Sequence, residues 1–411
     1  MSQPLRFVHA SDFHLERPLA GLAEIPAHLT DLLIDAPYAA AERVFELAES
    51  ERADFLILAG DIVNIDRAGP RAIAFLIDQF ERLAARDIAV YWLAGPAERR
   101  GPWPSDLKLP GNVHPFGRGA TQSVVHHADG DDLAELIGYG AAADERPTAA
   151  AKNKSSRFTI GVRHGAFHGR QLGKLAGHYW ACGGAKRRRQ TTSDGRPIVH
   201  SGTPQGRSPA HRGPHGAVVV EVDEHGVARP RFVATDLARY ARLRVEIDPA
   251  APRADQEHAL AERVQAALDK APGLDLFLRW QIVPVGAAGS GSAALGMSRE
   301  AWAQTWLRWL RQEFGTDSPA AWSMSVDVVL PRRRGQRSPQ DGSLLADFLA
   351  AVADAERDHD ELSLDRFVPE HWRHAHVAEL LSIADTSARR RVLRQARLLG
   401  NDLLGAEELS A

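Results

Sequence analysis

Two short apolar segments near the start of the chain are each followed by residues whose side chains commonly ligate divalent metal ions. Asp12 and His14 follow residues 5–10, and Asp61 follows residues 55–60. In an extended backbone, Asp12 and His14 would point to the same side because they lie two positions apart. Singly, each residue is explained better as a loop cap or an ordinary histidine. Together, at the ends of consecutive strands, they predict a metal centre in which the Asp61 carboxylate could bridge two ions.

The elements that must position these side chains alternate along the sequence. Residues 5–10, 55–60 and 89–95 have the apolar, β-favouring composition of buried strands, whereas 37–53 and 69–87 carry apolar residues at helical spacing. This alternation predicts βαβ units and a mostly parallel central sheet. The ends of such strands are where α/β folds place their ligands.

The composition is that of an ordinary folded chain with more than one domain. Its 411 residues are 44% hydrophobic and 25% charged, and the net charge of -3 does not favour a protein that coats nucleic acid. Basic runs at 186–190 and 331–337 are more often solvated surface than binding sites. Cys182 is the single cysteine, which excludes an intrachain disulfide, and no apolar run is long enough to span a bilayer. We therefore expect a cytoplasmic protein without a membrane segment.

Six sequence blocks stand in a characteristic order: HASDFHLERP, LAGDIVN, WLAGPAE, VRHGAFH, HYWACGGAK and VHSGTPQGR. They resemble the calcineurin-like metallophosphoesterases, and most closely the SbcD-like and YhaO-like DNA repair exonuclease branch. The resemblance covers about residues 5–236. It implies an α/β fold of the four-layer αββα type, with a two-metal site that holds Mn²⁺ or another divalent metal and hydrolyses phosphodiesters.

The resemblance also indicates which residues would hold the metals. It assigns ligand roles to Asp12, His14, Asp61 and His164. Asn64 stands where the family has the last acid of its Gly-Asp-x-x-Asp block. About half of the family's ligand set is therefore retained.

Other positions of the family pattern carry residues that cannot replace its ligands directly. Where the family has Gly-Asn-His, this chain has Gly95, Pro96 and Ala97, and where it has Gly-His-x-His, residues 183–186 read GGAK. The asparagine ligand, the histidine that acts near the scissile phosphate and both later histidines are absent. No catalytic residue can be assigned, and the resemblance predicts a degenerate centre with metal at reduced occupancy or absent.

Lys186 stands where a family histidine would hold the first metal. Its ammonium could lie among Asp12 and Asp61 and neutralise them without an ion. The alternative is a solvent-facing lysine at the start of a basic run, which is at least as common.

Four further residues have alternative interpretations. His168 or His178 could replace a lost ligand, although chance proximity is a strong alternative in a chain with 18 histidines. Glu98 could be an oxygen ligand, although surface glutamates are commoner. Arg207 could contact a phosphate or pair with an internal acid, and the structural use is the commoner one.

The remaining sequence predicts two further parts. A β-hairpin over 216–236 closes a first domain, residues 1–238. Residues 239–335 alternate strands and helices in the order of a small α+β domain, similar to the capping domain of the resembled exonucleases. Residues 336–411 are expected to form a C-terminal helical segment, with a helical pattern over 370–409 that either binds a partner or simply packs on the protein.

Three functions from different classes remain open. The first is a degenerate SbcD/YhaO-like subunit of DNA repair or DNA-end processing, which binds DNA or an SMC-type (SbcC-like) ATPase through its C-terminal helices without cutting. The second is an active metal-dependent phosphodiesterase or DNA exonuclease that uses one metal or substitute ligands. The third is a structural partner without nucleic-acid contact. A homodimer is compatible with each, and nucleotide binding through a P-loop or a dinucleotide glycine motif is not expected.

Overall fold

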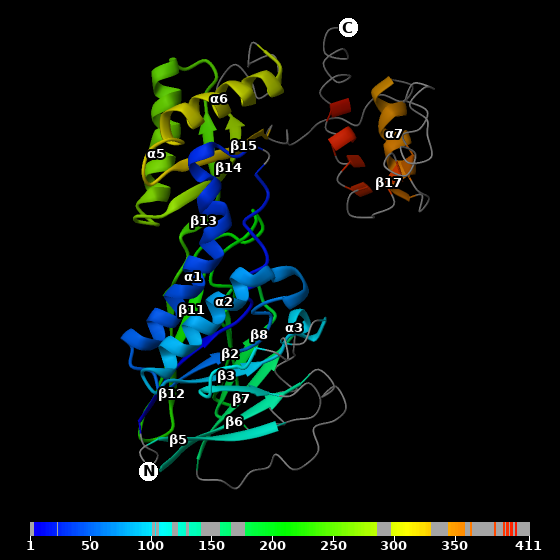
Figure 1. The fold of residues 1–411 in the computed structure, drawn as a ribbon. Helices are drawn as coiled ribbons and strands as arrows, with labels where there is room; N and C mark the ends of the chain where they lie inside the picture. Colours follow the sequence, from blue (N-terminus) through cyan, green and yellow to red (C-terminus); the bar gives the residue numbers. More distant parts are fainter. Residues whose placement is uncertain are drawn as a thin grey trace. The chain divides into compact units, whose positions relative to one another are not determined.

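Figure 1 shows the computed structural model of the chain. It describes residues 4–22, 24–100, 103, 107–116, 122–128, 131–140, 157–165, 177–285, 297–329 and 344–357, with short stretches between 362 and 400. The chain divides into two compact units, which we describe separately. The larger unit comprises Met1–Val245, Arg253–Ile282 and Ala303–Asp327, and the smaller unit the rest. The domain boundaries expected after residues 238 and 335 stay predictions.

The first sheet of the larger unit has its strands in the order β12-β11-β1-β2-β3-β4. Neighbours from β1 to β4 pair in parallel, and the hairpin β11-β12 joins β1 in antiparallel orientation. The predicted parallel sheet and hairpin are confirmed, although β2 and β3 end two residues earlier than expected. The bounds are β1 (Leu5–Ala10), β2 (Phe55–Leu58), β3 (Ala89–Leu93), β4 (Val113–Phe116), β11 (Gly216–Val222) and β12 (Ala228–Ala234).

Two long helices, α1 (Thr30–Ser50) and α2 (Ile65–Ala84), pack on this sheet (Figure 1). Phe45 of α1 and Phe80 of α2 are fully buried in one hydrophobic cluster with Leu56 of β2. Both are the helices predicted from the spacing of apolar residues, and each begins earlier than predicted. Because their apolar sides face the sheet, they hold the strand ends that carry the predicted ligands.

A second sheet has the order β5-β6-β7-β8-β10-β9. Phe7 and Ile57 of the first sheet share a buried cluster with Ile160 and Tyr179 of the second, so the two sheets pack face to face. The predicted α/β class and the sandwich of two large sheets flanked by helices are thus confirmed. The bounds are β5 (Gln122–Ala128), β6 (Asp131–Tyr139), β7 (Phe158–His164), β8 (Tyr179–Gly183), β9 (Arg189–Ser193) and β10 (Arg196–His200).

A third sheet, in the order β13-β14-β15, follows the sandwich. Trp280 of β14 donates its indole N–H to Ser323 Oγ at 3.0 Å, and Arg311 Nε donates to the Ser323 carbonyl at 2.8 Å. Strands and helices occur in the order predicted for the capping region. The bounds are β13 (Ala238–Ile247), α5 (Arg253–Leu268), β14 (Asp275–Pro284), α6 (Arg299–Phe314) and β15 (Ala321–Val328).

The C-terminal part contains α7 (Leu344–Arg357) and the short strand pair β16 (Leu362–Ser363) and β17 (Ser382–Ile383). Most of the helical pattern predicted for residues 370–409 lies outside the described residues. Of the helices that the structure describes, none combines the length and the apolar composition that a bilayer crossing requires.

Candidate metal centre

The loops after β1 and β2 carry three of the predicted ligands and are joined by backbone hydrogen bonds. The N–H groups of Asp12 and His14 donate to the carbonyl oxygens of Gly60 and Asp61, at 2.9 and 3.0 Å. Asp12, His14 and Asp61 all have left-handed backbone conformations, with φ of 58°, 45° and 55°. The expectation that Asp12 and His14 share an extended backbone is therefore wrong. Such strained turns are costly for non-glycine residues and concentrate at functional sites.

The side chains of Asp12, Asp61 and His164 converge, with one ligand atom of each within 4.8 Å of the others. His164 Nε2 lies 3.4 Å from Asp61 Oδ2, and its Nδ1 lies 2.8 Å from the Ala59 carbonyl oxygen. Because a carbonyl only accepts, Nδ1 carries a proton, and His164 Nε2 faces the centre: protonated it donates to Asp61, and deprotonated it could ligate a metal. His14 Nε2 lies 3.7 Å from Asp61 Oδ2. This donor set fits one divalent cation.

Pairing determines the charge of two of these groups. Burial alone would raise the pKa of Asp61, but the hydrogen bond and charge of His164 outweigh burial and lower this pKa to about 2. Burial alone would lower the pKa of His164, whereas the hydrogen bond to Asp61 and the charges of Asp12 and Asp61 raise it. Asp61 is therefore ionised at neutral pH.

Lys186 lies against the same group of side chains. Its Nζ is 2.9 Å from His14 Nε2 and 3.7 Å from Asp12 Oδ1, and 43% of the side chain is exposed. Because an ammonium only donates, His14 Nε2 is the acceptor and its lone pair is engaged in this arrangement. Among the described residues, the acid within ion-pair distance of Lys186 is Asp12 rather than Asp61.

The segment after β3, which the resemblance aligns with Gly-Asn-His, holds a buried carboxylate. Glu98 is 7% exposed and accepts hydrogen bonds from the N–H groups of Asp61, Ile62 and Val63, at 3.0, 2.5 and 3.2 Å, and of Gly95 at 2.8 Å. Burial raises the pKa of Glu98. Neither sequence-based interpretation, an oxygen ligand or a surface glutamate, describes this residue. Its carboxylate fixes the loop that carries Asp61.

Backbone N–H groups bind one oxygen of each acid in the centre. Ala97 N–H donates to Asp61 Oδ1 at 2.7 Å, and Gly184 N–H donates to Asp12 Oδ2 at 2.8 Å. Both donors stand where the resemblance expects a histidine. Gly184 has φ of 86°, and a Cβ at this position would lie 2.8 Å from the backbone nitrogen of Gly165. These two hydrogen bonds leave Asp12 Oδ1 and Asp61 Oδ2 available to the centre.

Arg207 is buried, at 7% exposed, in a region where the charges of Glu16 and Asp12 act on it. Its backbone N–H donates to His211 Nδ1 at 3.2 Å, but its side-chain Nε and Nη1 have no hydrogen-bond partner among the described residues. Burial lowers its pKa to about 10. A buried guanidinium with unpartnered N–H groups can bind an anion. The phosphate contact expected of Arg207 stays a prediction.

Of the two candidate substitute histidines, the structure describes His178, which lies away from the centre. His178 Nδ1 accepts the backbone N–H of Thr159 at 2.9 Å, and its ring stacks on Phe158. These contacts lie at the start of β7, whereas His164 ends that strand. His168 lies outside the described residues.

Glu16 is a residue of this region that the sequence analysis missed. Its Oε1 lies 3.5 Å from His14 Nδ1, and its Oε2 accepts the backbone N–H of Asn64 at 3.0 Å. Asn64 itself is buried and precedes α2. The only signal in the sequence was the place of Glu16 two residues after His14. Its carboxylate lies beside the ring of His14 and supports the loop between β2 and α2.

Part of the chain matches a known protein family. Residues 5–171 match the family model described as calcineurin-like phosphoesterase. The match covers less than half of the chain. It includes Asp12, His14, Asp61 and His164, and members of the family typically bind divalent metals. The match supports the family-level prediction for this region, whereas the DNA repair branch and the degeneracy of the centre stay predictions.

One similar curated protein is the uncharacterized metallophosphoesterase YhaO of Bacillus subtilis (strain 168). It is 26% identical over 238 residues, which cover 54% of this chain and 58% of the relative. The match therefore spans less than two thirds of the relative's length.

Two similar solved structures cover most of their own chains. GAP50, described as the anchor in the inner membrane complex of Plasmodium, has 12% identity and a TM-score of 0.34 over 57% of this chain and 85% of that chain. A dimetal phosphatase from Danio rerio has 10% identity and a TM-score of 0.34 over 54% of this chain and 93% of that chain.

Proposed function

We propose that this protein is a degenerate SbcD/YhaO-like metallophosphoesterase in which the Lys186 ammonium takes the place of the first cation. The observation that carries the proposal is the position of Lys186 Nζ, 2.9 Å from His14 Nε2 and 3.7 Å from Asp12 Oδ1. An ammonium and a divalent cation compete here because both need the same lone pair and the same negative charge. On this proposal the protein is a non-catalytic or severely impaired hydrolase.

The second cation position has few donors for a separate reason. Asp61 Oδ1 accepts the N–H of Ala97, which leaves Asp61 Oδ2 and His164 Nε2. Catalytic metal sites commonly use three protein ligands. Hydrolysis by two metals also requires two ions about 3.5–4 Å apart. Loss of a positioned acid-base residue costs about 10²- to 10⁴-fold in addition. We therefore expect phosphodiester hydrolysis near background.

We extend the proposal to DNA repair or DNA-end processing together with an SMC-type ATPase. The six sequence blocks and the similarity to YhaO support this branch of the family. The helical pattern at 370–409 would be the ATPase-binding element. Light scattering of the full chain mixed with a purified SbcC-like ATPase should detect a complex. Two separate species at micromolar concentrations would contradict this part of the proposal.

A second function is favoured by a different observation, the convergence of donors from Asp12, Asp61 and His164 within 4.8 Å. Three donors match the number that holds a catalytic metal while leaving a position open. The Lys186 side chain is 43% exposed and can swing out toward solvent. One ion held by these residues would supply a Lewis acid for a metal-dependent phosphodiesterase or DNA exonuclease.

Metal binding and hydrolysis measured on the same preparations separate the two functions. We would measure Mn²⁺ and Zn²⁺ binding by calorimetry and elemental analysis for the wild type, Asp61→Ala and Lys186→Ala. The matched control is Lys108→Ala, which removes an exposed lysine that is no part of the centre. The first function predicts at most one weakly bound ion in the wild type. It also predicts Mn²⁺ affinity at least tenfold higher in Lys186→Ala and unchanged in Lys108→Ala.

The opposite results are equally informative. A tightly bound ion that Asp61→Ala abolishes, with Mn²⁺-dependent cleavage of bis(p-nitrophenyl) phosphate or DNA, would establish the second function. Equal Mn²⁺ affinity in the wild type, Lys186→Ala and Lys186→His would show that the ammonium does not compete with the metal.

A further inference from the structure

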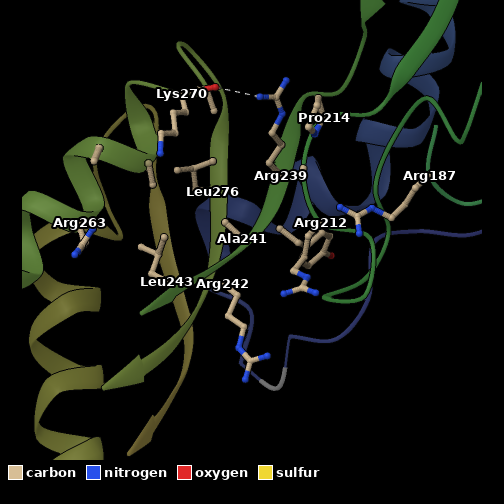
Figure 2. A pocket seen from close by; sticks show the side chains of 15 residues that line it. Arg187, Arg212, Pro214, Arg239, Ala241, Arg242, Leu243, Arg263, Lys270 and Leu276 are labelled. Atoms are coloured by element: carbon tan, nitrogen blue, oxygen red, sulfur yellow. Dashed lines mark hydrogen bonds between the residues drawn. The ribbon is translucent and has the colours of Figure 1, made fainter. Parts of the chain in front are cut away.

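A cavity of about 510 Å³ lies in the larger unit, between residues of β13, the end of α5 and the segment before β11 (Figure 2). Among the described residues that line it there is no aspartate or glutamate and none of the predicted metal ligands. In a chain of net charge -3, its positive charge is a local concentration that indicates an anionic ligand. The cations that line the cavity are Arg187, Arg212, Arg239, Arg242, Arg263 and Lys270.

One of these six cations is neutralised by the protein. The Arg239 guanidinium makes a two-point contact with Asp236, at 2.6 and 3.0 Å, and donates to the Lys270 carbonyl oxygen at 3.3 Å. Within the described part of the chain, the other five side chains have neither an ion pair nor a hydrogen bond, and all five residues are exposed. Like charges close together repel, so an anion bound among them relieves this repulsion.

The floor of the cavity is apolar. Tyr240, Ala271 and Leu276 line it and are buried. The Tyr240 hydroxyl donates to the Ala20 carbonyl oxygen at 3.0 Å, and its ring packs on Phe277 with 5.2 Å between centroids, so the ring is held in place. An apolar floor with a few convergent polar groups is typical of small-molecule sites.

The cations reach the cavity from separate elements. Figure 2 shows Arg263 and Lys270 on the α5 side, Arg187 and Arg212 on the opposite side, and Arg242 on β13. A single phosphate offers too little charge and too few oxygens for five cations, whereas a chain of phosphates offers both. We propose that this cavity binds a small molecule with two or more phosphates on an apolar group, of the nucleoside polyphosphate class. The phosphates contact the cations, and the apolar group lies on the floor.

A nucleic-acid strand is the competing ligand. Proteins that bind its backbone use a stripe of cations along an extended groove. Here the cations line one hollow, whose volume lies within the range of about 300–1,000 Å³ found for small-molecule pockets. The observations therefore favour a small ligand, held by side chains rather than by a glycine-rich loop. This inference is independent of whether the metal centre is active, because none of the predicted metal ligands lines the cavity.

Calorimetry with the full chain, in EDTA so that no divalent metal contributes, tests the proposal. The probes are ATP, inorganic tripolyphosphate and adenosine. We expect ATP and tripolyphosphate to bind, ATP more tightly because of the apolar floor, and adenosine to bind weakly. Affinity for both phosphate compounds should fall at high ionic strength, since screening weakens exposed charges. Tripolyphosphate binding as tightly as ATP would overturn the role assigned to the floor.

Two triple variants assign the binding to this cavity. Arg242→Ser combined with Arg263→Ser and Lys270→Ser should lower the affinity for ATP at least 100-fold, because charge-assisted hydrogen bonds are lost. A control triple removes the same number and types of charge from exposed positions outside the cavity and should leave the affinity unchanged. Its changes are Arg67→Ser, Arg308→Ser and Lys108→Ser. Circular dichroism and melting temperature check that both triples are folded.

Three results would overturn the proposal. The first is the absence of ATP binding by the wild-type protein at low salt. Equal loss of affinity in both triples would assign binding to the overall charge rather than to the cavity. The third is a DNA oligonucleotide that binds through Arg242, Arg263 and Lys270 and that ATP does not displace. This result would assign these residues to nucleic-acid binding instead.

Discussion

Replacement of Glu98 provides a sharp test of how the candidate centre is built. The two oxygens of its carboxylate each accept two backbone N–H groups: Oε2 those of Asp61 and Gly95, and Oε1 those of Ile62 and Val63. Glu98→Gln keeps the shape of the side chain but has one acceptor oxygen. Whichever way the amide is turned, two N–H groups lose their acceptor and face an NH₂ group instead.

The cost follows from the number of bonds lost. A buried N–H left without an acceptor costs about 1–3 kcal/mol, and bonds to a charged acceptor lie at the upper end. Two lost bonds at the 7% exposed Glu98 therefore predict a loss of about 3–5 kcal/mol in the free energy of unfolding of the larger unit. Because a typical domain is stable by only about 5–15 kcal/mol, this loss is large. Glu98→Ala should lose at least as much.

Urea unfolding followed by tryptophan fluorescence measures the global effect, and hydrogen exchange of peptides that contain residues 61–63 measures the local one. We expect an earlier unfolding midpoint and faster exchange at Ile62 and Val63. The matched control is Glu313→Gln, at an exposed position, which should change stability by less than about 0.5 kcal/mol. If Glu98→Gln cost less than about 1 kcal/mol and left exchange at 61–63 unchanged, the structural role assigned to this carboxylate would be refuted.

Three further predictions concern His126, Gly184 and Cys182. Burial, with the nearby histidines, lowers the pKa of His126 to about 4; below pH 6.5 the unfolded chain binds a proton that the folded state does not. Stability should therefore fall as the pH drops from about 6.5 to 4, and His126→Gln should reduce the slope of stability against pH where the exposed His225→Gln does not. Gly184→His should lower the melting temperature without restoring metal binding, because φ is 86° and its Cβ would lie 2.8 Å from Gly165 N; tight Mn²⁺ binding by this variant would contradict the geometry. Burial raises the pKa of Cys182 to about 12, so iodoacetamide at pH 8 should label this thiol in urea and leave it unlabelled in the folded protein, as mass spectrometry can check.

Much of the sandwich followed from local sequence patterns. The apolar segments 5–10, 55–60 and 89–95 alternate with two helical patterns, and such alternation leads to parallel strands whose ends meet at one edge of the sheet. The approach of Asp12 to Asp61 was predictable for this reason. The absence of histidine at positions 184 and 186 was also visible in the sequence, because it required only a comparison of residue types.

The roles of Glu98 and Lys186 depended on the tertiary structure. Glu98 had two interpretations from sequence, ligand or surface residue, and the buried role became visible only with the directions of the N–H groups at residues 61–63. Those directions result from the left-handed turn at Asp61, which no residue type at that position specifies. The contact of Lys186 with His14 joins residues far apart in the chain.

The cationic cavity shows the same limit most clearly. Its residues come from the segments 187, 212–214, 239–243, 263–271 and 276, and no short window of sequence contains more than a part of the charge. Arg187 appeared in the sequence as one member of a basic run, which usually means solvated surface. Local patterns determined which segments form strands and helices, because periodicity acts over a few residues. Packing between distant segments decided which charges line one cavity, because this depends on the positions of whole elements in space.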